Sequence, residues 1–165
     1  RSTMNDSLML QIARNLTDRQ ETVSTAESCT GGYIGHLLTG VSGSSAFYVG
    51  GVIAYANAVK TALLDVPADV LAREGAVSEA VARGMALGVQ KKMQTTYAIS
   101  VTGIAGPTGG TPEKPVGLVY IGLADTSHCI VQRFVFEGDR DAVKTAVSDT
   151  ALRWLAMQVG GDADA

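Results

Sequence analysis

Apolar residues recur along the chain with two periods, one typical of helices and one typical of strands. Between Leu8 and Leu16 every fourth residue is apolar, and the same spacing returns from Val81 to Met93. This spacing gathers apolar side chains on one face of a helix, so both segments are predicted to be helical. The predicted helices cover residues 6–19, 33–39, 58–64 and 78–93, and two more begin at residues 67 and 139.

Short runs rich in Val, Ile and Tyr lie between these helices and predict strands. They cover residues 22–27, 48–56, 97–102, 116–124 and 129–137. Strands and helices alternate early in the chain, which favours parallel strands with helices on both faces. The last two strands follow each other across "DTSH", which indicates an antiparallel hairpin. The sequence therefore predicts an α/β fold: a three-layer α/β/α sandwich with a mixed, mainly parallel sheet of about five strands.

Length and composition fit one globular domain, predicted to cover residues 4–159. The chain has 165 residues, of which 46% are hydrophobic and 18% charged, enough to form a sizeable core. Residues 1–3 precede the first methionine and are interpreted as an addition to the native chain, and residues 160–165 as a frayed tail. The two cysteines, Cys29 and Cys129, are far apart in the sequence, so they indicate neither a disulfide framework nor a metal site.

Charge and hydropathy exclude several classes of partner. A net charge of −3 and a single basic doublet argue against a nucleic-acid-binding protein. There is no long apolar run of the kind that spans a membrane and no secretion signal, so the predicted location is the cytoplasm. No histidine or acidic cluster suggests a bound metal. The apolar composition leaves room for a homo-oligomer.

Lys60 is the most unusual charged residue in the sequence. No Asp or Glu occurs between Glu27 and Asp65, and His36 is the only other basic residue in that interval. With Asn57 as the N-cap, Lys60 lies in the first turn of its helix, where the helix dipole and apolar neighbours lower the pKa of an amine. A lysine that acts as a general base must be neutral near pH 7, so the position suits that role. A solvent-exposed lysine is the alternative interpretation.

Two serine-containing segments are candidate partners of this lysine. Ser44 and Ser45 precede the predicted strand 48–56 and Lys60 follows it, so a Ser–Lys pair requires the chain to fold back; a plain turn is the alternative. The second segment is "AESCTGG", a strand-to-helix turn with Ser28 and Cys29. One interpretation is a nucleophile, Ser28 or Cys29, and the pKa of the Cys29 thiol would be lowered at the start of a helix. The other is an anion site built from the backbone N–H groups of residues 30–32.

Two further segments offer ligand contacts. The segment "TGIAGPTGG" follows the strand 97–102, at the edge where open α/β sheets bind ligands. Arg140 begins the last helix, and its guanidinium can grip a phosphate with two N–H groups. An ion pair with Asp139 or Asp141 is the alternative interpretation of Arg140.

Five motifs occur in order: "TAESCTGG", "GSSAFYVGGVIAYANAVK", "GAVSEAVA", "TGIAGPTGG…KPVG" and "GDRDAVK". Together they resemble the C-terminal domain of the competence-damage-inducible protein CinA, including its free-standing bacterial versions, over about residues 8–155. The resemblance implies a three-layer α/β/α domain. It also implies an amidase of pyridine nucleotide salvage that converts nicotinamide mononucleotide and water to nicotinate mononucleotide and ammonia.

The resemblance implies roles for individual residues as well. Ser45 and Lys60 would act as the catalytic pair, with Tyr55 relaying or orienting the proton. The resemblance and the glycine-rich turns together predict these substrate-binding residues: Glu27, Ser28, Thr30, Gly31, Ser44, Thr102, Gly103 and Arg140. The implied chemistry needs no metal and no cofactor, and its partner is a small pyridine nucleotide. The alternatives are an amidase that uses Ser28 or Cys29, and a non-catalytic regulatory module that binds pyridine nucleotides.

Overall fold

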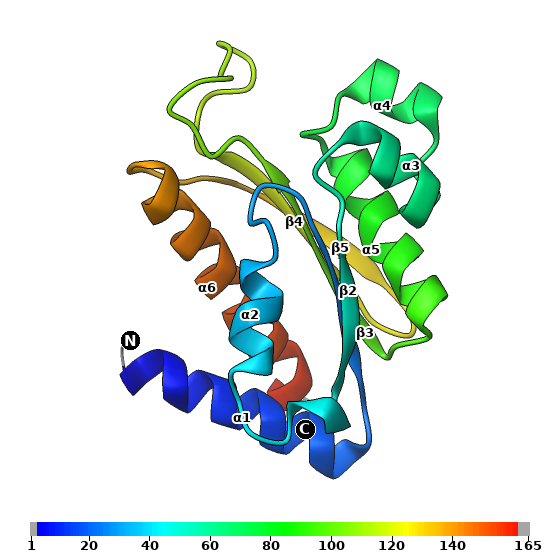
Figure 1. Cartoon of the computed structure of the whole chain (residues 1–165), viewed down its shortest axis with the longest axis vertical. Helices are drawn as coiled ribbons and strands as arrows, with labels where there is room; N and C mark the ends of the chain where they lie inside the picture. The colour runs from blue at the N-terminus through cyan, green and yellow to red at the C-terminus, as the bar shows by residue number, and fades with distance from the viewer. Residues whose placement is uncertain (1–2, 162–165) are drawn as a thin grey trace.

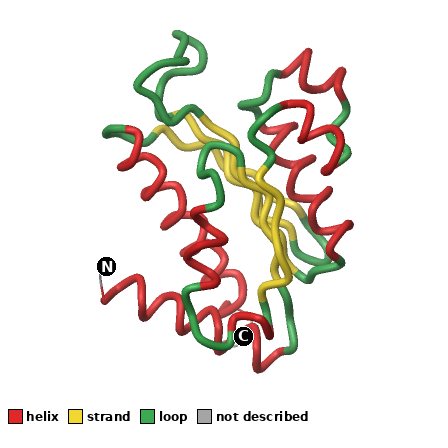
Figure 2. The backbone as a smooth tube through the Cα atoms, viewed as in Figure 1, coloured by secondary structure: helices red, strands yellow, loops and turns green. Residues whose placement is uncertain are grey.

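A five-stranded sheet lies between two layers of helices in the computed structural model, which describes residues 3–161 (Figures 1 and 2). The helices are α1 (Thr3–Arg19), α2 (Tyr33–Thr39), α3 (Asn57–Leu64), α4 (Ala68–Glu74), α5 (Glu79–Met93) and α6 (Arg140–Gly161). The strands are β1 (Val23–Glu27), β2 (Tyr48–Ile53), β3 (Tyr97–Gly103), β4 (Leu118–Ala124) and β5 (Cys129–Val135), and a short 3-10 helix, η1 (Ser44–Ala46), precedes β2. The predicted α/β class is confirmed.

The two terminal helices are longer than predicted. Helix α1 already begins at Thr3, upstream of the predicted cap at Asp6 or Ser7, and α6 continues through Gly161 into the predicted tail. Residues 1–2 and 162–165, which hold the rest of the predicted addition and tail, lie outside the described residues. Within residues 3–161, no helix is both long and apolar enough to cross a bilayer.

The strand order is β2-β1-β3-β4-β5. Strand β1 pairs in parallel with β2 and with β3, whereas β3 with β4 and β4 with β5 pair antiparallel. The parallel ladders join five residue pairs each and the antiparallel ladders six and seven, so the prediction of a mainly parallel sheet is wrong. Only the first three strands are joined by helices; a loop without a helix leads to β4 and a tight turn to β5, and such connections join antiparallel strands.

Two hydrophobic cores hold the helix layers against the sheet. Helices α1, α2 and α6 cover one face, and α3, α4 and α5 cover the other (Figure 1). The central strands β1 and β3 are almost entirely buried, as expected for strands between two helix layers. Helix α5 packs directly on α3, because a Cβ added at Gly88 would overlap the carbonyl oxygen of Leu64. Gly88 thus lets the two helices approach closely.

The connections between the parallel strands create a crevice at their carboxyl ends. Strand β1 lies between β2 and β3; the chain passes from β1 to β2 through α2 on one face, and from β2 to β3 through α3, α4 and α5 on the other. Neighbouring connections that diverge in this way leave an opening where open α/β sheets bind ligands. Loop 104–117 and the first turn of α6 lie at the same end of the sheet (Figure 1).

Candidate active site

Lys60 projects from α3 into the protein, and its side chain is 1% exposed. Its Nζ donates hydrogen bonds to the carbonyl oxygens of Ala54 (2.8 Å) and Tyr55 (3.1 Å) and to Ser28 Oγ (3.1 Å). No ion pair within residues 3–161 involves this amine. Desolvation by burial lowers the pKa of Lys60 below its ordinary value, as the sequence predicted. The alternative of a solvent-exposed lysine is wrong.

The start of α3 differs from the prediction. The N-cap is Ala56, in an extended conformation and without a side-chain cap, so Asn57 is already the first helical residue. Lys60 therefore lies one position further from the helix start than expected. Burial is the cause of the lowered pKa of its amine.

The two backbone carbonyls suit an amine that gains and loses a proton. A neutral amine has two N–H groups and one lone pair. When Ala54 and Tyr55 accept the two N–H groups, the lone pair faces Ser28, whose hydroxyl can donate to it. When the amine is protonated, its third N–H donates to Ser28 Oγ instead. The same three contacts therefore serve the amine before and after proton transfer.

Ser28 follows the last residue of β1, and its backbone fixes it between two segments. Its N–H donates to the carbonyl oxygen of Val101 on β3 (3.0 Å), and its own carbonyl accepts from the N–H of Gly31 (3.1 Å). The side chain is 8% exposed, so the hydroxyl meets the Lys60 amine in a largely desolvated place.

Glu27 holds the turn that follows Ser28. Its buried carboxylate accepts hydrogen bonds from Thr30 Oγ1 (2.6 Å), Ile34 N (2.9 Å) and Gly35 N (3.0 Å). The positive end of α2 is thus occupied by a carboxylate of the chain itself, and the N–H of Gly31 is bonded to Ser28. Glu27, Thr30 and Gly31, predicted to bind substrate, are absent from the lining of the cavity that contains Ser28.

A cavity of about 340 Å³ opens over Ser28 and Lys60 at the carboxyl ends of β1 and β3. The predicted residues Thr102, Gly103, Tyr55 and Arg140 all line it, as do Cys29, Asn57, Ala76, Val77, Thr108 and residues 104–106 and 109. The hydroxyl of Thr102 donates to the carbonyl oxygen of Ala76 (2.8 Å) and so fixes one wall of the cavity.

Arg140 and Tyr55 meet at the rim of this cavity. The Arg140 guanidinium donates to the carbonyl oxygen of Gly106 (2.7 Å) and to the Tyr55 hydroxyl (3.2 Å), which links the start of α6 to two loops. The Tyr55 side chain is 62% exposed. The predicted alternative for Arg140, an ion pair with Asp139 or Asp141, is not formed.

Ser44 and Ser45 do not reach Lys60. Both lie on η1, Ser45 is exposed, and neither lines the cavity. Helix η1 precedes β2 and α3 follows it, at opposite ends of the sheet (Figure 1). A strand rises about 3.3 Å per residue, so β2 alone separates its two ends by roughly 16 Å. The expected contact between Ser45 and Lys60 is wrong, because β2 runs extended along β1 and the chain does not fold back.

Cys29 lines the cavity but is not activated. Burial raises the pKa of its thiol to about 12, and the nearby Glu27 carboxylate contributes to the same direction. The predicted lowering of this pKa at a helix start is wrong, because α2 begins only at Tyr33 and its positive end is occupied by Glu27.

Sequence reasoning missed some residues of the cavity wall. Asn57 was interpreted as a helix cap, whereas it lines the cavity. Ala76 and Val77 lie in "GAVSEAVA", which contributed to the family resemblance without any role at the site. A polar residue three positions before a candidate catalytic lysine was the one local signal available.

Comparisons with known proteins identify the family of the chain. Residues 5–159 match the family model described as the CinA C-terminal domain. A CinA-like protein of Citrifermentans bemidjiense is 50% identical over 155 residues, which are 94% of this chain and 36% of that protein. A CinA-like protein of a Cyanothece species is 53% identical over 157 residues, 93% of this chain and 37% of that protein. The chain thus spans little more than a third of the length of these curated relatives.

Solved structures share the fold over nearly the whole chain. The competence damage-inducible protein A (ComA) of Klebsiella pneumoniae has a TM-score of 0.91 at 33% identity, covering 94% of this chain and 97% of that chain. The competence/damage inducible protein CihA of Agrobacterium tumefaciens has a TM-score of 0.91 at 37% identity, covering 94% and 95%. With the family match over residues 5–159, these likenesses show that the chain belongs to the CinA C-terminal domain family.

Proposed function

We propose that this chain is an amidohydrolase that deamidates nicotinamide mononucleotide, with Ser28 as the nucleophile and Lys60 as the general base. The observation that carries the proposal is the 3.1 Å contact between the Ser28 hydroxyl and a buried amine without a carboxylate partner in the described chain. A hydroxyl beside a neutral base is the arrangement that covalent catalysis of acyl transfer requires. The amide substrate comes from the resemblance to the family, and the role first given to Ser45 passes to Ser28.

The reaction can be followed atom by atom. Ser28 Oγ attacks the carboxamide carbon, and its proton passes to Lys60 Nζ, where the carbonyls of Ala54 and Tyr55 stabilise the new ammonium. The tetrahedral intermediate expels ammonia, which takes a proton back from Lys60 and leaves an ester on Ser28. Water then attacks this ester and gives a proton to Lys60. The proton returns to Ser28 Oγ as nicotinate mononucleotide leaves.

The rim of the cavity suits the phosphate end of the substrate. A guanidinium has five N–H donors, and the recorded hydrogen bonds of Arg140 occupy two of its nitrogen atoms, towards Gly106 and Tyr55. The remaining donors can bind a phosphate without displacing either contact. Arg140 therefore orients the nucleotide while its carboxamide reaches Ser28.

Ammonia release from nicotinamide mononucleotide tests the proposal. Ser28→Ala should lose at least about a thousandfold in kcat, since the covalent step disappears. Ser45→Ala is the matched control. The single variants Ser45→Ala and Cys29→Ala should each keep most of the activity. An active Ser28→Ala protein together with an inactive Ser45→Ala protein would overturn the assignment. Saturable nucleotide binding by the wild type without ammonia release would favour the regulatory module instead.

A further inference from the structure

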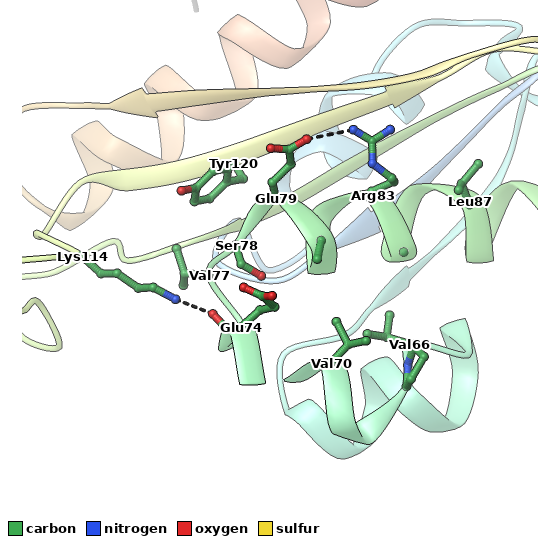
Figure 3. Close-up of a pocket in the computed structure, with 13 residues that line it drawn as sticks. Val66, Val70, Glu74, Val77, Ser78, Glu79, Arg83, Leu87, Lys114 and Tyr120 are labelled. Carbon is green, nitrogen blue, oxygen red and sulfur yellow. Dashed lines mark hydrogen bonds and ion pairs between the residues drawn. The ribbon is translucent and has the colours of Figure 1, made fainter. Parts of the chain in front are cut away.

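A second, larger cavity lies on the face of the molecule covered by α3, α4 and α5. It has a volume of about 680 Å³ and lies between α4, the first half of α5 and strand β4 (Figure 3). We call it the α4–α5 cavity. Aliphatic side chains line its α4 and α5 sides, among them Val66, Val70 and Leu87, and Tyr120 projects towards it from β4. Its size falls within the range typical of small-molecule sites, and it has no part in the chemistry proposed above.

The charged groups around this cavity are paired with one exception. Glu79 pairs with Arg83 at 3.0 Å, and the Glu74 carboxylate lies 3.5 Å from Arg73, which also pairs with Asp69 at 3.7 Å. The half-buried Lys114 instead donates to the backbone oxygen of Glu74 (2.7 Å) and has no carboxylate partner in the part of the chain that the structure describes. The cavity thus combines an aliphatic wall with one amine that makes no ion pair in the described chain.

We propose that the α4–α5 cavity binds a small apolar carboxylate, whose aromatic or branched body packs on the aliphatic wall and whose carboxylate pairs with Lys114. An ammonium has three N–H donors, and Lys114 uses one of them on Glu74. A carboxylate can therefore bind without breaking the existing hydrogen bond, and such charge-assisted contacts are strong. A cationic ligand is disfavoured, because the carboxylates of the cavity, Glu74 and Glu79, already pair with Arg73 and Arg83.

The segment 75–78 connects this cavity to the one that contains Ser28. Val77 lines both cavities. Gly75 has a φ of +79°, and a Cβ there would lie 2.8 Å from Lys114 Nζ, so only glycine lets the amine approach so closely. On the far side of the segment, the Ala76 carbonyl accepts from Thr102. A carboxylate held by Lys114 would therefore lie beside a segment that also forms a wall of the Ser28 cavity.

The test measures binding, so it does not depend on amidase activity. Titrating 3-phenylpropionate into the 165-residue protein, followed by two-dimensional NMR, should give saturable shifts that include the amides of Val77 and Ala76. Lys114→Gln should weaken binding about tenfold, as should replacing the probe by its neutral amide. Lys91→Gln, which removes an exposed cation on α5, is the matched control and should bind as the wild type does.

Three results would overturn the proposal. The first is an absence of saturation up to about 10 mM probe, a concentration that would saturate a site with a Kd of about 1 mM. The second is equal binding by Lys114→Gln and wild type. The third is loss of binding in Arg140→Gln, because it would place the probe in the Ser28 cavity. Saturation without shifts at residues 75–78 would refute the connection between the cavities.

Discussion

Ser28 and Lys60 are 32 positions apart in the chain, yet the Lys60 amine lies 3.1 Å from the Ser28 hydroxyl. The parallel ladder between β1 and β2 produces this contact. It continues one step beyond β2, where the N–H of Ala54 donates to the carbonyl of Glu27 (2.7 Å), and so aligns the ends of both strands. Helix α3 then turns back and directs Lys60 to the residue after β1.

Lys60→Arg should reduce ammonia release by at least about a hundredfold, because an arginine stays protonated and cannot act as a base. The wild-type kcat/KM should fall as the pH decreases through the lowered pKa of Lys60, since only the neutral amine accepts the Ser28 proton. Steady-state rates between about pH 5 and pH 9 measure both effects. Full activity of Lys60→Arg would remove Lys60 from the role of base.

The buried amine should also make folding stability depend on pH. In the unfolded chain Lys60 has its ordinary pKa near 10.5, whereas burial lowers this pKa in the folded protein. Between the two pKa values only the unfolded state holds the proton. The free energy of unfolding therefore gains up to about 1.4 kcal/mol per pH unit as the pH rises through that window.

The variant Lys60→Met lacks this contribution. The difference in unfolding free energy between wild type and Lys60→Met should therefore shift in favour of the wild type from about pH 7 to about pH 10. Urea denaturation at several pH values measures the difference, and the Met substitution at exposed Lys91 controls for the loss of one cation. A difference that stays constant over this range would show that Lys60 has the same pKa in both states.

The sequence identified the unusual lysine but paired it with the wrong serine. The absence of acids between Glu27 and Asp65 is a local signal, visible without a structure. The partner depends on which strands are neighbours and in which register. Strand β1 gives no sign of either, because all five of its positions are buried whether they are apolar or polar. Ser45 is close to Lys60 in sequence but lies at the other end of β2, whereas distant Ser28 lies beside it.

The antiparallel hairpin predicted at "DTSH" is confirmed by the pairing of β4 with β5. The direction of β4 relative to β3 and the start of α3 were undetermined for similar reasons. An apolar run predicts a strand but not its direction. The Gly- and Pro-rich segment before β4 predicts a loop without a helix, but a loop of this length does not by itself fix the direction of the strand that follows. A polar residue before a helix fits both a cap and a cavity wall, so Asn57 was ambiguous. The extended conformation of Ala56 decides the matter, and no residue type in that segment specifies it.

The Cys29 thiol should react slowly although it lines the cavity. Raising its pKa from about 9 to about 12 lowers the thiolate fraction at pH 8 by about a thousandfold. Iodoacetamide should therefore alkylate Cys29 in the folded protein at least about a hundredfold more slowly than in the urea-unfolded chain, as mass spectrometry of its peptide can measure. Equal rates in both states would mean that the thiol is neither buried nor protonated.

Glu27→Gln should destabilise the fold by about 1–3 kcal/mol, because it removes a charged acceptor from a buried set of hydrogen bonds. The amide oxygen can still accept from Thr30 and Ile34, but the amide nitrogen then faces the N–H of Gly35, a second donor. Urea denaturation measures the loss, and Glu113→Gln in the exposed part of loop 104–117 is the matched control, which should change little. If Glu27 instead bound substrate directly, Glu27→Gln would raise KM and leave the unfolding free energy unchanged.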